Sequence, residues 1–303
     1  MDIDILGSES LGVRGLCCVV RTSNRQFVID PGLALGYKRQ GLMPHPVQVA
    51  VGEDVRRSIV RALENSTDVV ISHFHGDHMP LTNANPYQLS LDSVKALLKK
   101  PSLWMKGESG ETPRIAERPK RLLAALERTA SPCDGQRHKP LSFSKPMPHG
   151  SGQRPMGTVM MTRIEEGDEV FVHASDIQLL DDEPVSQIID WHPTIVLLSG
   201  PPLYREIPAA WISEAAARAK ALAKVVKWCI VDHHLLRSME GVKWLNVLHA
   251  QTAGRVVCAA DFMKDKCRLL EANRVALYRR MPVPENWHEL YAEGLVDTSK
   301  FRK

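Results

Sequence analysis

The sequence has no long run of apolar residues. Although 44% of its 303 residues are hydrophobic, no segment reaches the roughly 18 consecutive apolar residues that a membrane-spanning helix needs. The first ten residues, MDIDILGSES, contain acidic residues and no basic region ahead of a hydrophobic stretch, so they do not look like a secretory signal. We therefore expect a cytoplasmic protein that has no membrane partner.

Cysteines are few and show no paired motif. The six cysteines lie mostly inside apolar runs (GLCCVV, KWCIV, RVVCAA), and none has the C-x-x-C spacing of a zinc ribbon. We expect buried, reduced thiols. Excess charge is also small, because the net charge is only +4. This value permits an anionic substrate but does not by itself indicate a nucleic-acid-binding protein.

Histidine, in contrast, is concentrated in one place. The segment ISHFHGDH (71–78) holds three histidines and an aspartate in six positions, directly after the apolar stretch DVVIS. His73 and His75 are two residues apart, so at the end of a strand they point to the same side and can chelate one ion. Gly76 permits a tight turn that directs Asp77 and His78 toward a second ion. The segment predicts a metal site that needs further ligands from elsewhere.

Hydrophobic periodicity predicts an α/β protein. The first 35 residues read as strands joined by turns, and 67–78 as a short buried strand that opens into a loop. Further strands are expected in 158–176 (two, antiparallel), 192–202, 227–234 and 254–262, and helices in 54–65, 90–100, 119–130, 208–226, 241–253 and 264–278. The interval 80–148 is rich in Pro, Gly, Ser and basic residues, which indicates a cap or insertion over the site.

The motif HFHGDH and the order of the later candidate ligands resemble those of the metallo-β-lactamase fold superfamily of metal-dependent hydrolases. Within it, the segments ASDIQ, LLSGPPLY, VDHHLLR, and AADFM followed by LLEANR are most similar to the UPF0282 group. The resemblance implies an αββα sandwich of two central mixed sheets flanked by helices. It also implies one domain over 1–303, with the cap at about 80–148.

The resemblance assigns ligands to two ions and a bridging carboxylate: His73, His75 and His149 for the first ion, Asp77, His78 and a final histidine for the second, and Asp176 as the bridge. We take His233 as the final histidine because it directly follows an apolar strand and Asp232, with His234 as an alternative ligand or supporting residue. Asp77 and Asp30 are the catalytic candidates, although Asp30 also fits a simple Asp-Pro-Gly turn or a role in ordering the loops of the site.

Several residues compete with these candidates. His138 is an alternative to His149, and Asp181 and Asp182 are alternatives to Asp176 that look like solvated turn residues. His173 fits a strand or supporting residue better than a ligand. Asp232 and Arg237 fit either a substrate clamp or a structural ion pair.

The chemistry implied by the resemblance is hydrolysis by a metal-bridging hydroxide. The cofactors would be two divalent transition metal ions, zinc first and manganese or iron as alternatives. Basic residues in the expected cap favour a phosphodiester substrate, as a nucleotide or nucleic acid, over a lactone, thioester or β-lactam. A homo-oligomer, and a metal-bound scaffold or nucleic-acid binder without turnover, stay open. The basic residues are Lys95, Lys99, Lys100, Lys106, Arg114, Arg118, Lys120, Arg121, Arg128, Arg137, Lys139, Lys145 and Arg154.

Overall fold

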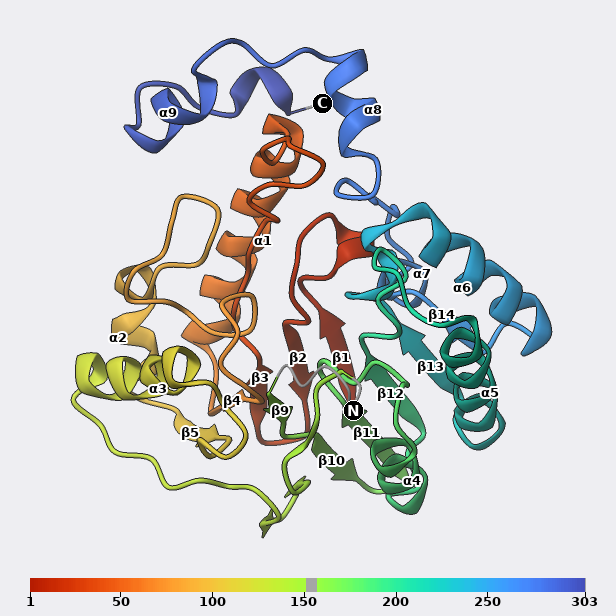
Figure 1. Ribbon diagram of the computed structural model, residues 1–303. Coiled ribbons are helices and arrows are strands. Elements are labelled where there is room, and N and C mark those ends of the chain that lie inside the picture. The colour runs from red at the N-terminus through yellow and green to blue at the C-terminus, as the bar shows by residue number, and fades with distance from the viewer. Residues whose placement is uncertain (151–156, 303) are drawn as a thin grey trace.

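Two sheets form the centre of the protein in a computed structural model that describes residues 1–150 and 157–302 (Figure 1). The first sheet has the order β1-β2-β3-β4-β5, in which β1 to β3 are antiparallel and β3, β4 and β5 run parallel. Its strands are β1 (Asp2–Ile5), β2 (Cys18–Arg21), β3 (Gln26–Ile29), β4 (Asp68–Ile71) and β5 (Ser102–Met105).

The second sheet has the order β14-β13-β12-β11-β10-β7-β6. Strands β11 to β14 run parallel, while β10, β7 and β6 extend the sheet by antiparallel pairing. Its strands are β6 (Arg137–His138), β7 (Leu141–Phe143), β10 (Thr162–Glu166), β11 (Glu169–His173), β12 (Ile195–Leu198), β13 (Trp228–Val231) and β14 (Val256–Val257), and a separate ribbon pairs β8 (Met147–Pro148) with β9 (Thr158–Val159).

Alternation along the strands of the first sheet explains why both of its faces are covered. Val28 of β3 and Val69 of β4 belong to one apolar cluster together with residues of the helix α1 (Pro46–Glu64). Their neighbours Phe27 and Val70 belong to the other cluster, together with residues of the second sheet. Successive side chains of a strand point to opposite faces, so this sheet lies between a helical layer and the second sheet. The αββα sandwich predicted from the sequence is the observed fold.

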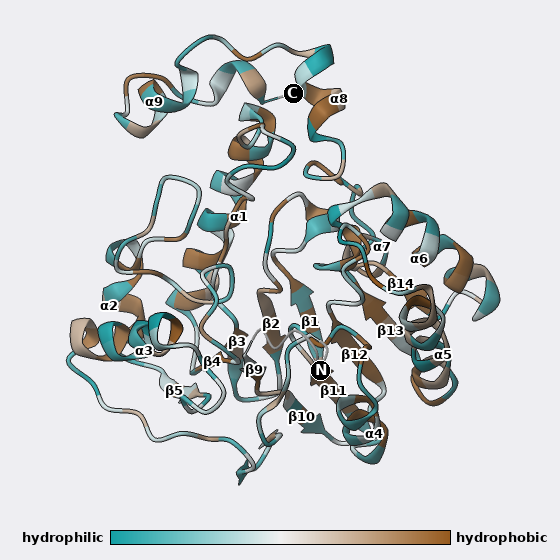
Figure 2. Cartoon of the chain, viewed as in Figure 1, coloured by the Kyte–Doolittle hydropathy of each residue, from teal (hydrophilic) through white to brown (hydrophobic). Residues whose placement is uncertain are grey.

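Helices cover the outer faces of both sheets (Figure 1). Figure 2 shows apolar residues concentrated on the central strands, with polar residues on the outer surfaces of the helices. Beside the first sheet lie α1, α2 (Lys95–Leu98) and α3 (Pro113–Leu126), and beside the second lie α4 (Asp182–Asp190), α5 (Ala209–Val225), α6 (Met239–Gln251) and α7 (Ala259–Met263). No helix in the described part of the chain is both long and apolar enough to cross a membrane.

The C-terminal segment packs against α1, at the top of Figure 1. It contains α8 (Arg274–Arg280) and α9 (Trp287–Ala292). Trp287 is buried in the cluster that includes α1, and the hydroxyls of Tyr291 and Thr298 donate hydrogen bonds to Glu53 of α1. The C-terminal segment therefore packs against and hydrogen-bonds to α1, the helix that covers the first sheet.

Several predicted elements differ from the observed ones. Residues 259–262, predicted as the end of a strand, lie in the helix α7, because Cys258 caps it: its Sγ accepts a hydrogen bond from the N–H of Asp261. Only the end of the predicted helix 264–278 is helical, in α8. Helix α4 was missed, although two acidic residues in its first turn are a typical start signal. The interval 80–148, expected as a cap, also supplies β5 to the first sheet and β6 and β7 to the second.

Candidate metal centre

The candidate ligands lie where parallel strands of the two sheets end. Asp30 directly follows β3, His73 comes two residues after β4, Asp176 three residues after β11, and His233 two residues after β13. Sites in layered α/β proteins lie at the carboxyl ends of strands, where loops from neighbouring strands meet. The fold therefore brings together residues that are as much as 200 positions apart in the chain.

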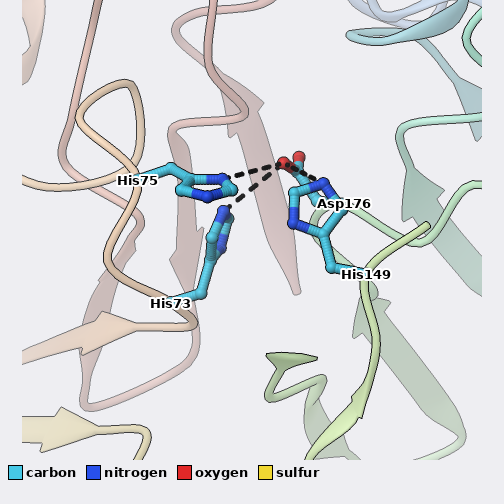
Figure 3. A group of neighbouring side chains, drawn as sticks. All are labelled: His73, His75, His149 and Asp176. Carbon is cyan, nitrogen blue, oxygen red and sulfur yellow. Dashed lines mark ion pairs between the residues drawn. The ribbon is translucent and has the colours of Figure 1, made fainter. Parts of the chain in front are cut away.

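The first cluster consists of His73, His75, His149 and Asp176 (Figure 3). In Figure 3 the three imidazoles point toward one oxygen of the aspartate. Their nitrogens lie 3.4 Å (His73 Nε2), 4.0 Å (His75 Nδ1) and 3.2 Å (His149 Nε2) from Asp176 Oδ2. Three imidazoles and one carboxylate are a donor set that suits zinc and other first-row divalent metals.

The second cluster consists of Asp77, His78 and His233. Here the histidines face the other oxygen of Asp176: His78 Nε2 is 3.2 Å and His233 Nε2 is 3.4 Å from Oδ1. Asp77 Oδ2 lies 3.5 Å from His233 Nε2. The two oxygens of a single carboxylate thus face two separate groups of histidines, as a bridging ligand would require.

His233 and His234 both lie in the centre. The chain leaves β13 before these residues, so strand alternation does not direct them to opposite faces, and His233 has a left-handed backbone (φ 28°). His234 Nε2 is 3.2 Å from Asp176 Oδ2, on the side of the first cluster, and its Nδ1 pairs with the Tyr204 hydroxyl at 2.9 Å. His233 therefore accompanies the second cluster and His234 adjoins the first.

Asp30 lies behind the ligands and orients His78. Its Oδ2 pairs with His78 Nδ1 at 3.0 Å, which leaves Nε2 of that ring facing Asp176. Asp30 also accepts hydrogen bonds from the N–H and hydroxyl of Ser72 and from the hydroxyl of Ser175. Burial alone would raise the pKa of Asp30, but the hydrogen bond and charge of His78 outweigh it and lower this pKa. Its geometry is that of a carboxylate that fixes a histidine ligand.

Two glycines let the HFHGDH loop pack closely on its supports. A Cβ on Gly32 of the Asp-Pro-Gly turn would lie 2.2 Å from the backbone nitrogen of Met79. Gly15 has φ +132°, a Cβ there would lie 2.7 Å from the carbonyl oxygen of Asp77, and its N–H donates to His233 Nδ1 at 3.2 Å. Any larger residue at these two positions would push the loop away from the centre.

The buried polar atoms of the centre fit a metal. Among the described residues, His73 Nε2, both ring nitrogens of His149, and Asp176 Oδ1 are buried without a hydrogen-bond partner. Buried polar groups without partners are rare and each needs an explanation. Burial lowers the pKa of His73 and of His149, which keeps both imidazoles neutral, the form that binds metal. The residues of the first cluster therefore fit a divalent ion.

Arg237 lies against the second cluster. Its Nη2 is 2.7 Å from Nε2 and 3.3 Å from Nδ1 of His233. Two such similar distances place the guanidinium over the ring face rather than along a nitrogen lone pair. Nη2 is also 3.5 Å from Asp77 Oδ2, while Nε donates to Glu9 at 2.9 Å. A fixed cation beside this cluster repels a second positive ion, so the second site is expected to bind metal more weakly than the first.

The competing candidates lie elsewhere. His138 is exposed on β6 and pairs with Gln136, and His173 pairs with the carbonyl of Leu16. Asp181 is the N-cap residue of α4 and Asp182 its first residue. Asp232 accepts hydrogen bonds from the backbone N–H groups of Ser10, His233 and Ala259, which is a structural role. Arg154 lies outside the described residues.

Sequence reasoning missed several residues around the centre. Tyr204 touches His234, and Ser72 and Ser175 hold Asp30. The segment LLSGPPLY begins in β12 and runs into the loop after it, so a tyrosine in a loop that follows a strand was an available signal for Tyr204. The serines carried no signal, because hydroxyl residues are common in every loop.

Solved structures with a similar arrangement have low sequence identity. A CmlA β-hydroxylase variant has a TM-score of 0.50 and 12% identity over 81% of this chain and 51% of its own. An isothiocyanate hydrolase from Delia radicum gut bacteria has a TM-score of 0.49 and 16% identity over 81% of this chain and 94% of its own. A metal-dependent hydrolase of the beta-lactamase superfamily has a TM-score of 0.48 and 13% identity over 84% of this chain and 94% of its own. At these identities the likeness to the CmlA structure is one of fold alone.

Curated relatives define the family. A UPF0282 protein of Methanosarcina mazei is 48% identical over 97% of both chains, and one of Methanopyrus kandleri is 33% identical over 89% of this chain and 96% of its own. A third, from Thermococcus gammatolerans, is 32% identical over 91% of this chain and 94% of its own. No protein-family model matches the chain. The chain belongs to the UPF0282 family, as its resemblance predicted.

Proposed function

We propose that the protein is a two-metal hydrolase that acts on phosphodiesters. The observation that carries the metal-dependent part is the Asp176 carboxylate, whose two oxygens face two groups of histidines with buried, unpaired nitrogens. The proposed ligands are His73, His75, His149 and Asp176 for the first ion, and Asp77, His78, His233 and Asp176 for the second. Zinc is the first choice, with manganese and iron as alternatives.

The two ions, when bound, supply an activated water as nucleophile and take up the negative charge of the transition state. The protein residues fix the geometry. Asp30 accepts a hydrogen bond from Nδ1–H of His78 and so directs Nε2 of that ring toward Asp176. Asp77 is the more accessible carboxylate, with 18% of its side chain exposed against 2% for Asp176, so we assign it the contact with the reacting groups.

The substrate assignment rests on an arginine face of α3. Arg114, Arg118 and Arg121 follow one another at helical spacing and line a pocket of about 260 Å³ together with residues 79–83, directly after the metal motif. Arg118 donates to the carbonyl of Phe74, inside that motif. None of the three arginines makes an ion pair with any residue in 1–150 or 157–302. Unpaired guanidinium groups at this spacing suit the phosphates of a nucleotide or nucleic acid.

Two other functions compete with this one. A lactone, thioester or β-lactam hydrolase would use the same centre but would not need the arginine face. A metal-bound scaffold or nucleic-acid binder would keep the metal and the arginines without turnover. Activity on a panel of substrates separates all three.

The experiment compares a phosphodiester, a lactone and a thioester with added zinc or manganese. We expect the phosphodiester to be hydrolysed by the wild-type protein and not by the His75→Ala, Asp77→Ala double variant. Equal residual activity in this variant would contradict the hydrolase assignment. Preference for the lactone or thioester would contradict the substrate class.

A matched pair of variants tests the arginine face. Arg118→Ala removes a cation that faces the pocket, while Lys120→Ala removes one that pairs with Glu117 on the same helix. We expect only Arg118→Ala to raise KM for the phosphodiester, by roughly tenfold, as for one lost charge-assisted hydrogen bond. Equal KM values for the two variants would remove the arginine face from substrate binding.

A further inference from the structure

A second pocket adjoins the metal centre on the side away from α3. It has a volume of about 280 Å³ and lies between the loop at Arg39, the loop at Tyr204, the start of α6 and the segment at Glu271. Two of its lining residues contact candidate ligands directly: Arg237 lies on the ring of His233, and the Tyr204 hydroxyl pairs with His234 Nδ1. Whatever binds in this pocket therefore lies next to the reacting groups.

The aromatic ring of Tyr204 contacts both arginines of the pocket. The guanidinium of Arg39 lies over its ring at 4.5 Å from the centroid, and that of Arg237 at 5.6 Å. The ring also stacks on His234, with centroids 6.2 Å apart and an interplanar angle of 14°. Stacking on an aromatic face holds a guanidinium in place while leaving its N–H groups free to bind an anion.

The pocket is lined by charges of both signs, Arg39 and Arg237 on one hand and Glu240 and Glu271 on the other. Arg39 has no hydrogen bond from its side chain within the described residues, and its nearest carboxylate oxygen, in Glu271, is 3.8 Å away. Glu271 is already held by Arg14 through two short contacts. The connected charges are four arginines (Arg14, Arg39, Arg237, Arg274) and three carboxylates (Glu9, Asp77, Glu271). Arg39 is therefore the lining cation whose N–H groups are left to bind an anion.

We propose that this pocket binds a phosphoryl group of the substrate, held by Arg39 and Arg237. This inference rests on the proposed function and makes it more specific: the substrate carries a phosphate beside the bond that is cleaved, in addition to any phosphate at the α3 face. Two guanidinium groups beside the ring of Tyr204 suit a tetrahedral dianion, and Arg is the residue best adapted to bind phosphate by several N–H groups at once.

The test measures phosphate binding to the metal-free protein, because phosphate would otherwise also bind to the ions. Isothermal titration of the EDTA-treated full chain with inorganic phosphate compares the wild type with Arg39→Gln, Arg39→Lys and the control Lys38→Gln, which removes the neighbouring exposed cation. We expect Arg39→Gln to weaken binding at least tenfold, Arg39→Lys to recover part of the loss, and Lys38→Gln to bind like the wild type. Thermal unfolding midpoints check that each variant is folded.

Two outcomes would overturn the inference: no phosphate binding to the metal-free wild type, or equal binding by Arg39→Gln and the wild type. Both leave the proposed hydrolase untouched, since that is tested by turnover with metal. Conversely, absence of turnover together with Arg39-dependent phosphate binding would reject the hydrolase and keep the pocket. A parallel titration with a nucleoside monophosphate identifies the source: tighter binding than inorganic phosphate assigns the phosphate to a nucleotide, and equal binding assigns the pocket to the phosphoryl group alone.

In the metal-loaded enzyme, Arg39→Gln is expected to raise KM for a substrate with such a phosphate and to leave kcat close to the wild-type value. Arg39 contacts no candidate metal ligand, so a loss confined to kcat would contradict a role in substrate binding.

Discussion

His149 is the single residue on which the first metal cluster most depends. Both of its ring nitrogens are buried and unpaired among the described residues, and it reaches Asp176 from a segment remote from the HFHGDH loop. The sequence offered His138 as the competitor, but that side chain is exposed on an edge strand. A ligand needs a fixed backbone, and the β8–β9 ribbon next to His149 provides it.

We therefore expect His149→Ala to lose the tightly bound metal equivalent, and His138→Ala to keep it. The reason is that the first cluster then keeps only two of its three imidazoles, those of His73 and His75. Elemental analysis of the two variants, purified without added metal, measures the difference. Full metal content in His149→Ala would show that this residue is not a ligand.

At the scale of elements, the segment between α7 and α8 is tied to the N-terminal loop by a buried ion pair. Glu271 binds Arg14, and although burial would raise the pKa of Glu271, the hydrogen bond and charge of Arg14 lower it from 4.5 to about 2. A carboxyl whose pKa is lowered in the folded state stabilises the protein above the pKa it has when unfolded. That stabilisation is lost as the pH falls from about 4.5 to about 2.

The wild-type protein should therefore lose stability relative to Glu271→Gln as the pH falls through this window. A change of this size corresponds to at most about 3 kcal/mol of the free energy of unfolding. Urea unfolding of both proteins between pH 7 and pH 3 measures it, with Glu285→Gln, an exposed position, as the control. A difference in stability that does not change with pH would contradict the role of the ion pair.

The C-terminal helices are a second element whose contribution can be measured. Trp287 is 4% exposed in the cluster that contains α1, while Leu295, eight residues later, is 67% exposed. Loss of a large buried side chain removes its transfer free energy and leaves a cavity. We expect Trp287→Ala to lower the free energy of unfolding by about 3–5 kcal/mol and Leu295→Ala to change it little, as measured by urea denaturation. Similar values for both variants would mean that the C-terminal segment does not support α1.

For the whole molecule, the centre joins the two sheets, so metal binding should stabilise the fold. The first cluster takes His73 and His75 from the first sheet and Asp176 from the second. A ligand that binds only the folded state stabilises it by about 2.7 kcal/mol at one hundred times its Kd. For a chain of this size that corresponds to roughly 5 °C in Tm.

We expect zinc to raise the Tm of EDTA-treated wild-type protein, and to leave that of the His73→Ala, His149→Ala double variant unchanged. Differential scanning calorimetry with and without zinc measures both. An equal shift in the double variant would place the stabilising ion elsewhere, whereas no shift in the wild type would mean that the centre does not bind zinc under those conditions.

Local signals in the sequence determined the α/β class, through apolar runs of strand length and helical periodicity in 208–226. The sandwich and the candidate ligands outside the HFHGDH loop came from the family resemblance. The sequence also placed His73, His75, Asp77 and His78 in one loop, because neighbours in a short segment must lie close together. Short elements such as α4 and α7 were missed, since a few residues carry little periodicity.

Only the tertiary structure decided how residues from different strands meet. It directs His233 and His234 to opposite sides of Asp176, which strand alternation cannot predict once the chain has left β13. It also places Arg237 against the second cluster and stacks Arg39 on Tyr204, contacts between segments that are distant in the chain. The physical reason is that periodicity fixes the direction of a side chain only within a regular element, while the loops that carry this centre take their shape from packing between the two sheets.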